Sequence, residues 1–306
     1  MNKAELTRLI KQKAFQLGFN NIGITKYQKL ENEKKALENF FSNHYHGTLS
    51  FLERTTNQRE DIQLFFPNTK SIIMILASYF PKQVQQPSKY QISYYTYSND
   101  YHTVIKNKLQ ELLTFIKELK PETNGKIFCD TSPVFEKAYA SLANLGWIGK
   151  NSLLIHPQFG SFVFLGGIAV DIELCFDEPN NRTCPSHCTL CMDACPTHAI
   201  EKPYVLNATK CISYFTLEER NKNFYFNNPT HYIAGCDLCQ KVCPFNLNSN
   251  LSKTNSWFEP NNYVFWNDEK WETLNAEEFK TTFNKTIFGR IGYEILLRNI
   301  KLVTST

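Results

Sequence analysis

The chain has 306 residues, enough for one large domain or two smaller ones with a sizeable core. Its 42% hydrophobic and 14% aromatic content fits a folded globular protein, and no apolar run approaches the roughly 20 residues of a membrane span. The net charge of +4 is mildly basic, which permits a nucleic-acid partner without demonstrating one. The first residues contain no apolar core of a signal peptide, so we expect a soluble, cytoplasmic protein with reduced thiols.

The first 120 residues alternate between helical and strand patterns. In chain order we predict a helix over 2–17 that ends at Gly18, a short strand over 21–25, an amphipathic helix over 28–42, a buried strand over 71–79 after a turn at Pro67–Asn68, a long tyrosine-rich loop over 81–100, and a helix over 101–119. Long loops inside compact domains are often functional.

The next elements surround an aspartate. A strand over 125–129 places Asp130 at its carboxyl end. Thr131 or Ser132 can cap a following helix that has Pro133 at its first position and runs to about Leu145. Residues 147–155 and 161–171 then predict a hairpin around the turn HPQFG.

Two helices are predicted near the end of the chain, over 276–283 and 288–303. Their apolar positions are Phe279, Phe283, Phe288, Ile291, Ile295 and Leu296. Arg290, Arg298 and Lys301 lie on or near the final helix, where the simplest interpretation is a solvated charged face on a packing helix.

Eight of the ten cysteines fall between residues 184 and 243, and both cysteine runs end in a cysteine followed directly by proline, at Cys195 and Cys243. Two-cluster ferredoxins use C-x2-C-x2-C-x3-C-P runs in which the fourth cysteine ligates the other cluster. This crossing rule gives one [4Fe–4S] cluster to Cys184, Cys188, Cys191 and Cys243, and a second to Cys195, Cys211, Cys236 and Cys239. The first gap is one residue longer than usual, which makes Cys184 the least secure ligand. A zinc ribbon fits the spacing less well, and disulfides would require an oxidising compartment.

Asp130 is the best candidate for acid–base chemistry. A carboxylate at the end of an apolar strand sits where sheets present ligands, and burial by Ile127 and Phe128 would raise its pKa. The alternative is that Asp130 only caps the next helix. The histidines at 44, 46, 102 and 156 are scattered along the sequence, so none is predicted to act at the site. Cys129 and Cys175 are interpreted as small buried hydrophobes.

These patterns predict an α+β fold of three parts. Residues 1–175 form a sheet domain with helices, 176–250 a ferredoxin-like domain for two [4Fe–4S] clusters, and 251–306 a helical segment that packs on the core. No G-x-G-x-x-G fingerprint supports a dinucleotide-binding domain. Because so much chain surrounds the clusters, a reductase is favoured over a pure electron carrier.

Several segments in order along the chain resemble the epoxyqueuosine reductases of queuosine tRNA modification. They are Arg59 with PNTKSI, NDYHTVIKNKL, CDTSPVFEKAYA, GWIGKNSLLIHPQFGSFVFLGGI, the eight-cysteine region with KCISYFTLE, and the F-x3-F and R-x7-RN ending. The resemblance implies a cobalamin-dependent reductase that converts the epoxide of epoxyqueuosine, at the wobble position of tRNA, to the alkene of queuosine. It also implies that Asp130 is the proton donor to the epoxide oxygen.

The resemblance further implies the residues that contact the cofactor and the tRNA. The implied corrinoid contacts are Arg59, Ser93, Tyr95, Asp130, Lys150, Asn151, Leu154, Gly160, Ser161, Leu165 and Ser213, and Arg290 and Arg298 are implied tRNA contacts. The implied partners are an epoxyqueuosine-containing anticodon stem-loop and an external electron donor, with the protein acting as a monomer. The alternatives are a corrinoid iron–sulfur reductive dehalogenase and a two-cluster electron-transfer protein.

Overall fold

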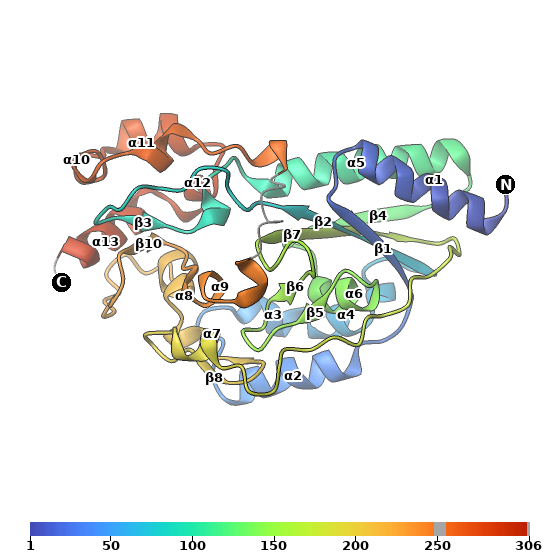
Figure 1. Ribbon diagram of the computed structural model, residues 1–306, viewed down its shortest axis with the longest axis horizontal. Helices are drawn as coiled ribbons and strands as arrows, with labels where there is room; N and C mark the ends of the chain where they lie inside the picture. The colour runs from blue at the N-terminus through green and yellow to red at the C-terminus, as the bar shows by residue number, and fades with distance from the viewer. Residues whose placement is uncertain (248–254, 305–306) are drawn as a thin grey trace.

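A four-stranded antiparallel sheet, with strand order β1-β2-β7-β4, lies at the centre of the computed structural model, which describes residues 1–247 and 255–304 (Figure 1). Its strands are β1 (Asn21–Lys26), β2 (Ser71–Ser78), β4 (Gly125–Phe128) and β7 (Val163–Val170). Every residue of β2 is buried, which confirms the predicted buried strand. Alternate side chains of β2 enter two different clusters, Ile73 and Ile75 on one face and Ile72 and Met74 on the other.

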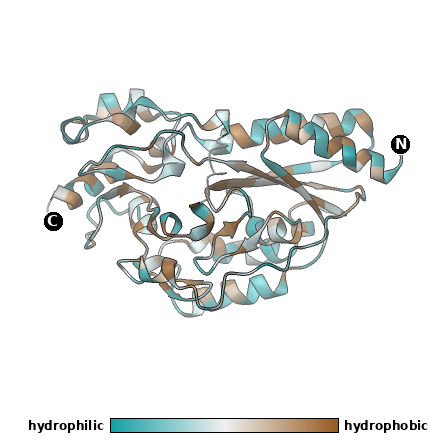
Figure 2. Cartoon of the chain, viewed as in Figure 1, coloured by the Kyte–Doolittle hydropathy of each residue, from teal (hydrophilic) through white to brown (hydrophobic). Residues whose placement is uncertain are grey.

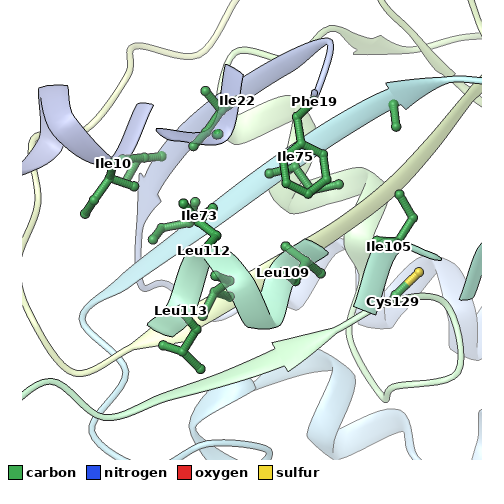
Figure 3. Close-up of a cluster of buried hydrophobic side chains, with 14 of the residues drawn as sticks. Ile10, Phe19, Ile22, Ile73, Ile75, Ile105, Leu109, Leu112, Leu113 and Cys129 are labelled. Carbon is green, nitrogen blue, oxygen red and sulfur yellow. The ribbon is translucent and has the colours of Figure 1, made fainter. Parts of the chain in front are cut away.

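Two helices cover one face of this sheet, α1 (Lys3–Gln16) and α5 (Tyr101–Leu119). Ile10 of α1 and the stripe Ile105, Leu109 and Leu112 of α5 pack on the sheet (Figure 3). The Asp100 side chain caps α5 by accepting a hydrogen bond from the His102 amide. The periodicity that predicted both helices therefore marks their buried faces.

The other face is covered by α6 (Glu136–Leu142), with α2 (Glu31–Ser42), α3 (Ser50–Arg54) and α4 (Thr56–Glu60) beyond it (Figure 1). Tyr139 and Ala140 of α6 belong to the cluster of that face. Gly23 lets β1 approach the end of α6 closely, because a Cβ atom at this position would lie 1.8 Å from the carbonyl oxygen of Ala143, which ends α6. The result is a helix–sheet–helix sandwich.

The cysteine-rich region carries short elements: α7 (Leu190–Asp193), β8 (Ile200–Lys202), β9 (Val205–Leu206), α8 (Ile212–Leu217), β10 (Tyr232–Ala234) and α9 (Leu238–Lys241). β10 pairs in parallel with β3 (Gln91–Ile92), which comes from the long loop before α5. The cysteine-rich region is thereby joined to the first part of the chain.

The C-terminal helices pack on this β3–β10 pair. They are α10 (Asp268–Glu272), α11 (Ala276–Phe283), α12 (Ile287–Ile291) and α13 (Tyr293–Thr304). Their cluster contains all six predicted apolar positions, together with Trp271 and with Ile92 and Ile233 of the strand pair. Hydrophobic residues concentrate on the sheet and on the inner helix faces (Figure 2).

The remaining short elements are β5 (Trp147–Ile148), β6 (Leu154–Ile155) and the 3-10 helices Ile62–Leu64, Tyr94–Thr96, Ala208–Lys210, Pro244–Asn246, Ser256–Phe258 and Asn262–Phe265. The predicted domain boundary at 250–251 lies outside the described residues. Among the helices that the structure describes, none combines the length and apolarity needed to span a bilayer.

Three predicted elements differ from the structure. α6 begins at Glu136 after a bent segment, so neither Thr131 nor Ser132 caps it. The hairpin forms between β5 and β6, whereas β7 joins the central sheet, because its apolar run is long enough to be buried between β2 and β4. The last predicted helix is divided at Gly292, whose φ of +90° is not helical.

Candidate active site

A cavity of about 610 Å³ opens between α2, the segment after β4, the start of β7 and the β8–β9 hairpin. Most of the residues that line it are apolar. Five charged residues also line it: Glu33 of α2, Arg59, Asp130, Glu136 and Lys137. Apolar walls with a few convergent charged groups are typical of ligand sites in proteins. The segment 130–138 supplies much of the chemistry of this cavity.

Asp130 is placed in the cavity by an unusual backbone turn directly after β4. Its φ of 55° lies in the left-handed region, which aspartate tolerates better than most residues. The Asp130 amide donates a hydrogen bond of 2.5 Å to Oε1 of Glu136. The Asp130 side chain remains 55% exposed, so its carboxylate is accessible to a ligand.

His102 is the immediate partner of this carboxylate. Its Nε2 lies 2.8 Å from Oδ2 of Asp130, and its Nδ1 lies 2.6 Å from Oδ1 of Asp100. Nη1 of Arg290 lies 2.7 Å from Nδ1 and 2.9 Å from Nε2 of the same ring. Three segments thus meet at one imidazole: the start of α5, the end of β4 and α12.

The charges of this network determine its protonation. Burial acts to raise the pKa of Asp130, but the hydrogen bond from His102 and the positive charges of His102 and Arg290 outweigh it and lower that pKa. Burial acts to lower the pKa of His102, but the hydrogen bonds to Asp100 and Asp130 prevail and raise it. The expectation of a raised Asp130 pKa is therefore wrong, because that expectation considered burial without the cationic partners.

Glu136 is the second carboxyl group of the cavity. Burial, together with the nearby negative charge of Asp130, raises the pKa of Glu136 to about 8, and burial is the larger cause. Asp130 and Glu136 therefore differ in protonation at neutral pH although both line the same cavity.

The cysteines of the first predicted set surround one small space. Cys184, Cys188, Cys191 and Cys243 all line an apolar cavity of about 100 Å³. Burial is the largest cause of the raised pKa of Cys191, and the thiols of Cys184, Cys188 and Cys243 are near enough to add to it. Despite its longer spacing, Cys184 lies with the other three.

The second predicted set also gathers. Burial mainly raises the pKa of Cys236, to about 12, and the thiols of Cys211 and Cys195 contribute to the shift. Burial is likewise the largest cause of the raised pKa of Cys239, and the thiols of Cys236 and Cys211 add to it. Within the described residues, no group of three or more His, Cys, Asp or Glu side chains is close enough to hold a single ion.

Two of the residues implied as corrinoid contacts instead line the first cysteine cavity. Lys150 Nζ donates hydrogen bonds to the carbonyl oxygens of Pro185, Ser186 and Cys188, at 2.9, 2.8 and 2.7 Å. Asn151 lines the same cavity. The Lys150 ammonium group therefore holds the loop that carries Cys184 and Cys188.

Only three of the other implied corrinoid contacts line the large cavity, and the rest lie elsewhere in the structure. Arg59, Asp130 and Leu165 line the large cavity, and Leu154 is buried in β6. Gly160 and Ser161 pack on the segment after α9, where the Ser161 amide donates to Oδ1 of Asn246. Ser93 and Tyr95 lie against Gly235, next to Cys236, and Ser213 belongs to α8.

The two implied tRNA contacts occupy very different positions. Arg290 is exposed on α12 beside His102. Arg298 is only 6% exposed, and its guanidinium group donates to the carbonyl oxygens of Phe215, Glu219 and Asn221. The expectation of a solvated Arg298 is wrong, because the side chain points from α13 into the segment around α8.

The sequence interpretation missed His102 and Glu136. The scattered positions of the histidines in the sequence do not indicate a site that contains His102. Its place two residues after Asp100, the cap of α5, does indicate a histidine held beside a carboxylate. Glu136 lies six residues after Asp130 in the segment CDTSPVFEKAYA, and only the turn after β4 brings the two together.

Comparisons with protein families, curated relatives and solved structures all find similarity to epoxyqueuosine reductases. Residues 59–131 match the family model "Epoxyqueuosine reductase QueG, DUF1730", and residues 184–246 match "4Fe-4S double cluster binding domain". An epoxyqueuosine reductase of Cellulophaga algicola is 40% identical over 97% of this chain and 98% of its own length. A crystal structure of an epoxyqueuosine reductase with an epoxyqueuosine-modified tRNA-Tyr stem loop is 28% identical, with a TM-score of 0.89 over 99% of this chain and 82% of that one. The Bacillus subtilis enzyme, with an aspartate-bearing catalytic loop swung out of its active site, is 26% identical, with a TM-score of 0.88 over the same shares of the two chains.

Proposed function

This chain belongs to the epoxyqueuosine reductase family, and from that membership we propose that it reduces the epoxide of epoxyqueuosine in tRNA to the alkene of queuosine. The observation that carries the proposal is the carboxylate of Asp130, accessible in a largely apolar cavity and hydrogen-bonded to His102. Reduction of an epoxide to an alkene releases its oxygen as water, so the site must supply protons as well as electrons. Asp130 is the group that we propose donates to the epoxide oxygen.

The electrons come through the cysteine-rich region. The chain carries a domain for two [4Fe–4S] clusters, and we propose the two crossed ligand sets given by the spacing rule. The cavity lined by Cys184, Cys188, Cys191 and Cys243 supports the first set. An external one-electron donor would reduce these clusters, and we propose that the protein acts as a monomer.

The residues around the large cavity fit a corrinoid. Its walls are mainly aliphatic and aromatic, as the face of a tetrapyrrole requires. Ser93 does not line this cavity but lies against Gly235, and its buried hydroxyl has no hydrogen-bond partner among the described residues. We propose that Arg59, Leu165 and Ser93 contact cobalamin, and that Lys150, Gly160 and Ser161, which have protein partners, support the surrounding walls. When bound, cobalamin supplies the low-potential cobalt chemistry that opens a carbon–oxygen bond. The apolar walls exclude water from the reacting groups, and Asp130 delivers the proton to the oxygen that leaves.

The tRNA would reach the cavity past α12. Arg290 is exposed there, with its guanidinium group at the His102 ring, so we propose it as a contact for the anticodon stem-loop. The carboxylates of this network alone would repel tRNA phosphates, and Arg290 offsets that charge locally. Because tRNA is the proposed substrate, we propose a cytoplasmic location.

The decisive experiment uses anaerobically purified protein with cobalamin, a chemical reductant and tRNA from cells that lack this gene. Nucleoside mass spectrometry should show epoxyqueuosine converted to queuosine. Asp130→Asn should bind cobalamin and tRNA as the wild type does but lose turnover by at least about 100-fold. If the wild type forms no queuosine while its clusters are intact, the proposed function is wrong and the electron-carrier interpretation gains support.

A further inference from the structure

Proton supply is a separate requirement of the proposed reaction. Reducing an epoxide to an alkene breaks both bonds to the oxygen, forms one carbon–carbon double bond and releases water, which consumes two electrons and two protons. The lowered pKa of Asp130 leaves its carboxylate ionised at neutral pH, so Asp130 must receive each proton that it donates within the catalytic cycle. The source has to be a group that remains in place while the tRNA covers the cavity.

His102 is built to be that group. Its Nε2 lies 2.8 Å from Oδ2 of Asp130, which is direct proton-transfer distance. Its ring is fixed from several sides: Asp100 holds Nδ1 at 2.6 Å, and the Tyr101 ring stacks on it with a centroid distance of 4.0 Å. The His102 side chain is 9% exposed, whereas Asp130 is 55% exposed, so the imidazole lies behind the carboxylate rather than beside a ligand.

Charged groups from every neighbouring element face this imidazole. Asp100 precedes α5, Asp130 follows β4, and Arg290 comes from α12. The two carboxylates favour the imidazolium, and the guanidinium opposes it. When both ring nitrogens face carboxylate oxygens, the ring donates on both sides only if it carries both protons. The contact with Asp130 therefore matches a proton on Nε2, and the Arg290 guanidinium, which can only donate, then acts on the ring as a repelling charge and not as a hydrogen-bond partner.

We propose that His102 supplies the protons that Asp130 passes to the epoxide oxygen, with Asp100 holding the imidazole in place. This inference rests on the proposed function and deepens it. The proton leaves Nε2 for the Asp130 carboxylate, which passes it to the oxygen that leaves as water, and His102 regains its proton from solvent. The two electrons come from the one-electron donor that feeds the clusters. His102 thus acts through Asp130, as a positioning and relay residue.

Glu136 is less suited to this role although it also lines the cavity. Its contact with Asp130 is an acceptor contact, since Oε1 receives the Asp130 backbone amide. That bond fixes the turn after β4, and no hydrogen bond joins the two carboxyl groups in the part of the chain that the structure describes. We assign Glu136 to holding the backbone of Asp130 in its left-handed conformation.

The test compares His102→Gln with wild type in anaerobic turnover of epoxyqueuosine tRNA across pH. The wild-type rate should fall as pH rises through the His102 pKa, because the stored proton is then lost. His102→Gln should be slower by about 100-fold and should regain activity with added imidazole. Its rate should also lack the fall at high pH, which we call the alkaline limb of the pH profile. His231→Gln, the same change at an exposed histidine of the β10 edge, should behave as wild type.

A second variant keeps the test independent of folding damage. Asp100→Asn retains a good helix cap, because asparagine caps as well as aspartate does, but removes the charge that holds the imidazolium. Its alkaline limb should move to lower pH. A His102→Gln enzyme with the wild-type pH profile and no response to imidazole would overturn the relay, whatever its rate. Absence of queuosine with the wild type would instead overturn the proposed function itself.

Discussion

Arg298 provides a sharp test of the difference between a structural arginine and a tRNA-binding one. Its guanidinium group donates to the carbonyl oxygens of Phe215 at 2.6 Å, Glu219 at 2.9 Å and Asn221 at 2.8 Å. In Arg298→Ala these three carbonyls lose their donor. Because a hydrogen bond from a charged group contributes at least about 1 kcal/mol, the loss of three should lower the free energy of unfolding by about 3 kcal/mol.

The assay is thermal denaturation of the anaerobic holoprotein. With roughly 2 °C for each kcal/mol in a chain of this size, the midpoint should fall by about 6 °C. Arg8→Ala is a matched control, because Arg8 is exposed and donates to the exposed side chain of Gln12 on the same helix, so its midpoint should change by less than about 1 °C.

The same variant separates the two roles in tRNA binding. Below the denaturation range, Arg298→Ala should retain the wild-type dependence of tRNA affinity on salt, since a buried guanidinium releases no counterions. An arginine that contacts a phosphate contributes about 0.7 to 0.9 to the slope of log affinity against log salt. An unchanged denaturation midpoint together with a smaller salt slope would refute the structural assignment.

Three further results are expected. Cys184→Ser should lower the iron content from about eight to about four atoms per chain, and full retention of iron would show that Cys184 is not a ligand. Lys150→Met should also lose iron, because the carbonyls of the Cys184–Cys188 loop lose their common donor; loss of cobalamin affinity with intact clusters would instead favour a corrinoid contact. Burial lowers the pKa of His156 from 6.5 to about 4. Between these two pH values His156 is protonated in the unfolded chain but neutral in the folded protein, so the free energy of unfolding should fall as pH drops from about 6.5 towards 4. In urea denaturation His156→Gln should show a smaller loss of stability between pH 7 and pH 5 than wild type.

The sequence predicted elements whose periodicity and burial coincide. The stripe Ile105, Leu109 and Leu112 marks the buried face of α5, and the continuous apolar run of β2 marks a strand covered on both faces. The grouping of the cysteines was also predictable, because the ligand spacing reflects local geometry around each cluster. Even Cys184, with its longer gap, lies where the crossing rule puts it.

What the sequence could not supply was the partner of each charged group. Asp130 meets His102 from α5 and Arg290 from α12, and these cations reverse the pKa shift expected from burial alone. Arg298 shows the same limit, since the carbonyl groups that it binds belong to another segment. Helix periodicity tells which side of a helix is apolar, but it does not reveal that a charged side chain is buried with its own set of acceptors.

The parallel pairing of β3 with β10 has a consequence for how the protein is made. Gln91 pairs with Tyr232 and Ile92 with Ala234, so the loop that carries Ser93 and Tyr95 cannot reach its final position until the ribosome has released the cysteine-rich region. The central sheet needs no residue beyond β7, and it can form earlier in synthesis. The wall of the proposed cofactor site is therefore completed late, at about the time when the cluster ligands become available. Maturation therefore has a built-in order, in which the central sheet can be complete before the strand pair that joins it to the cysteine-rich region is able to form.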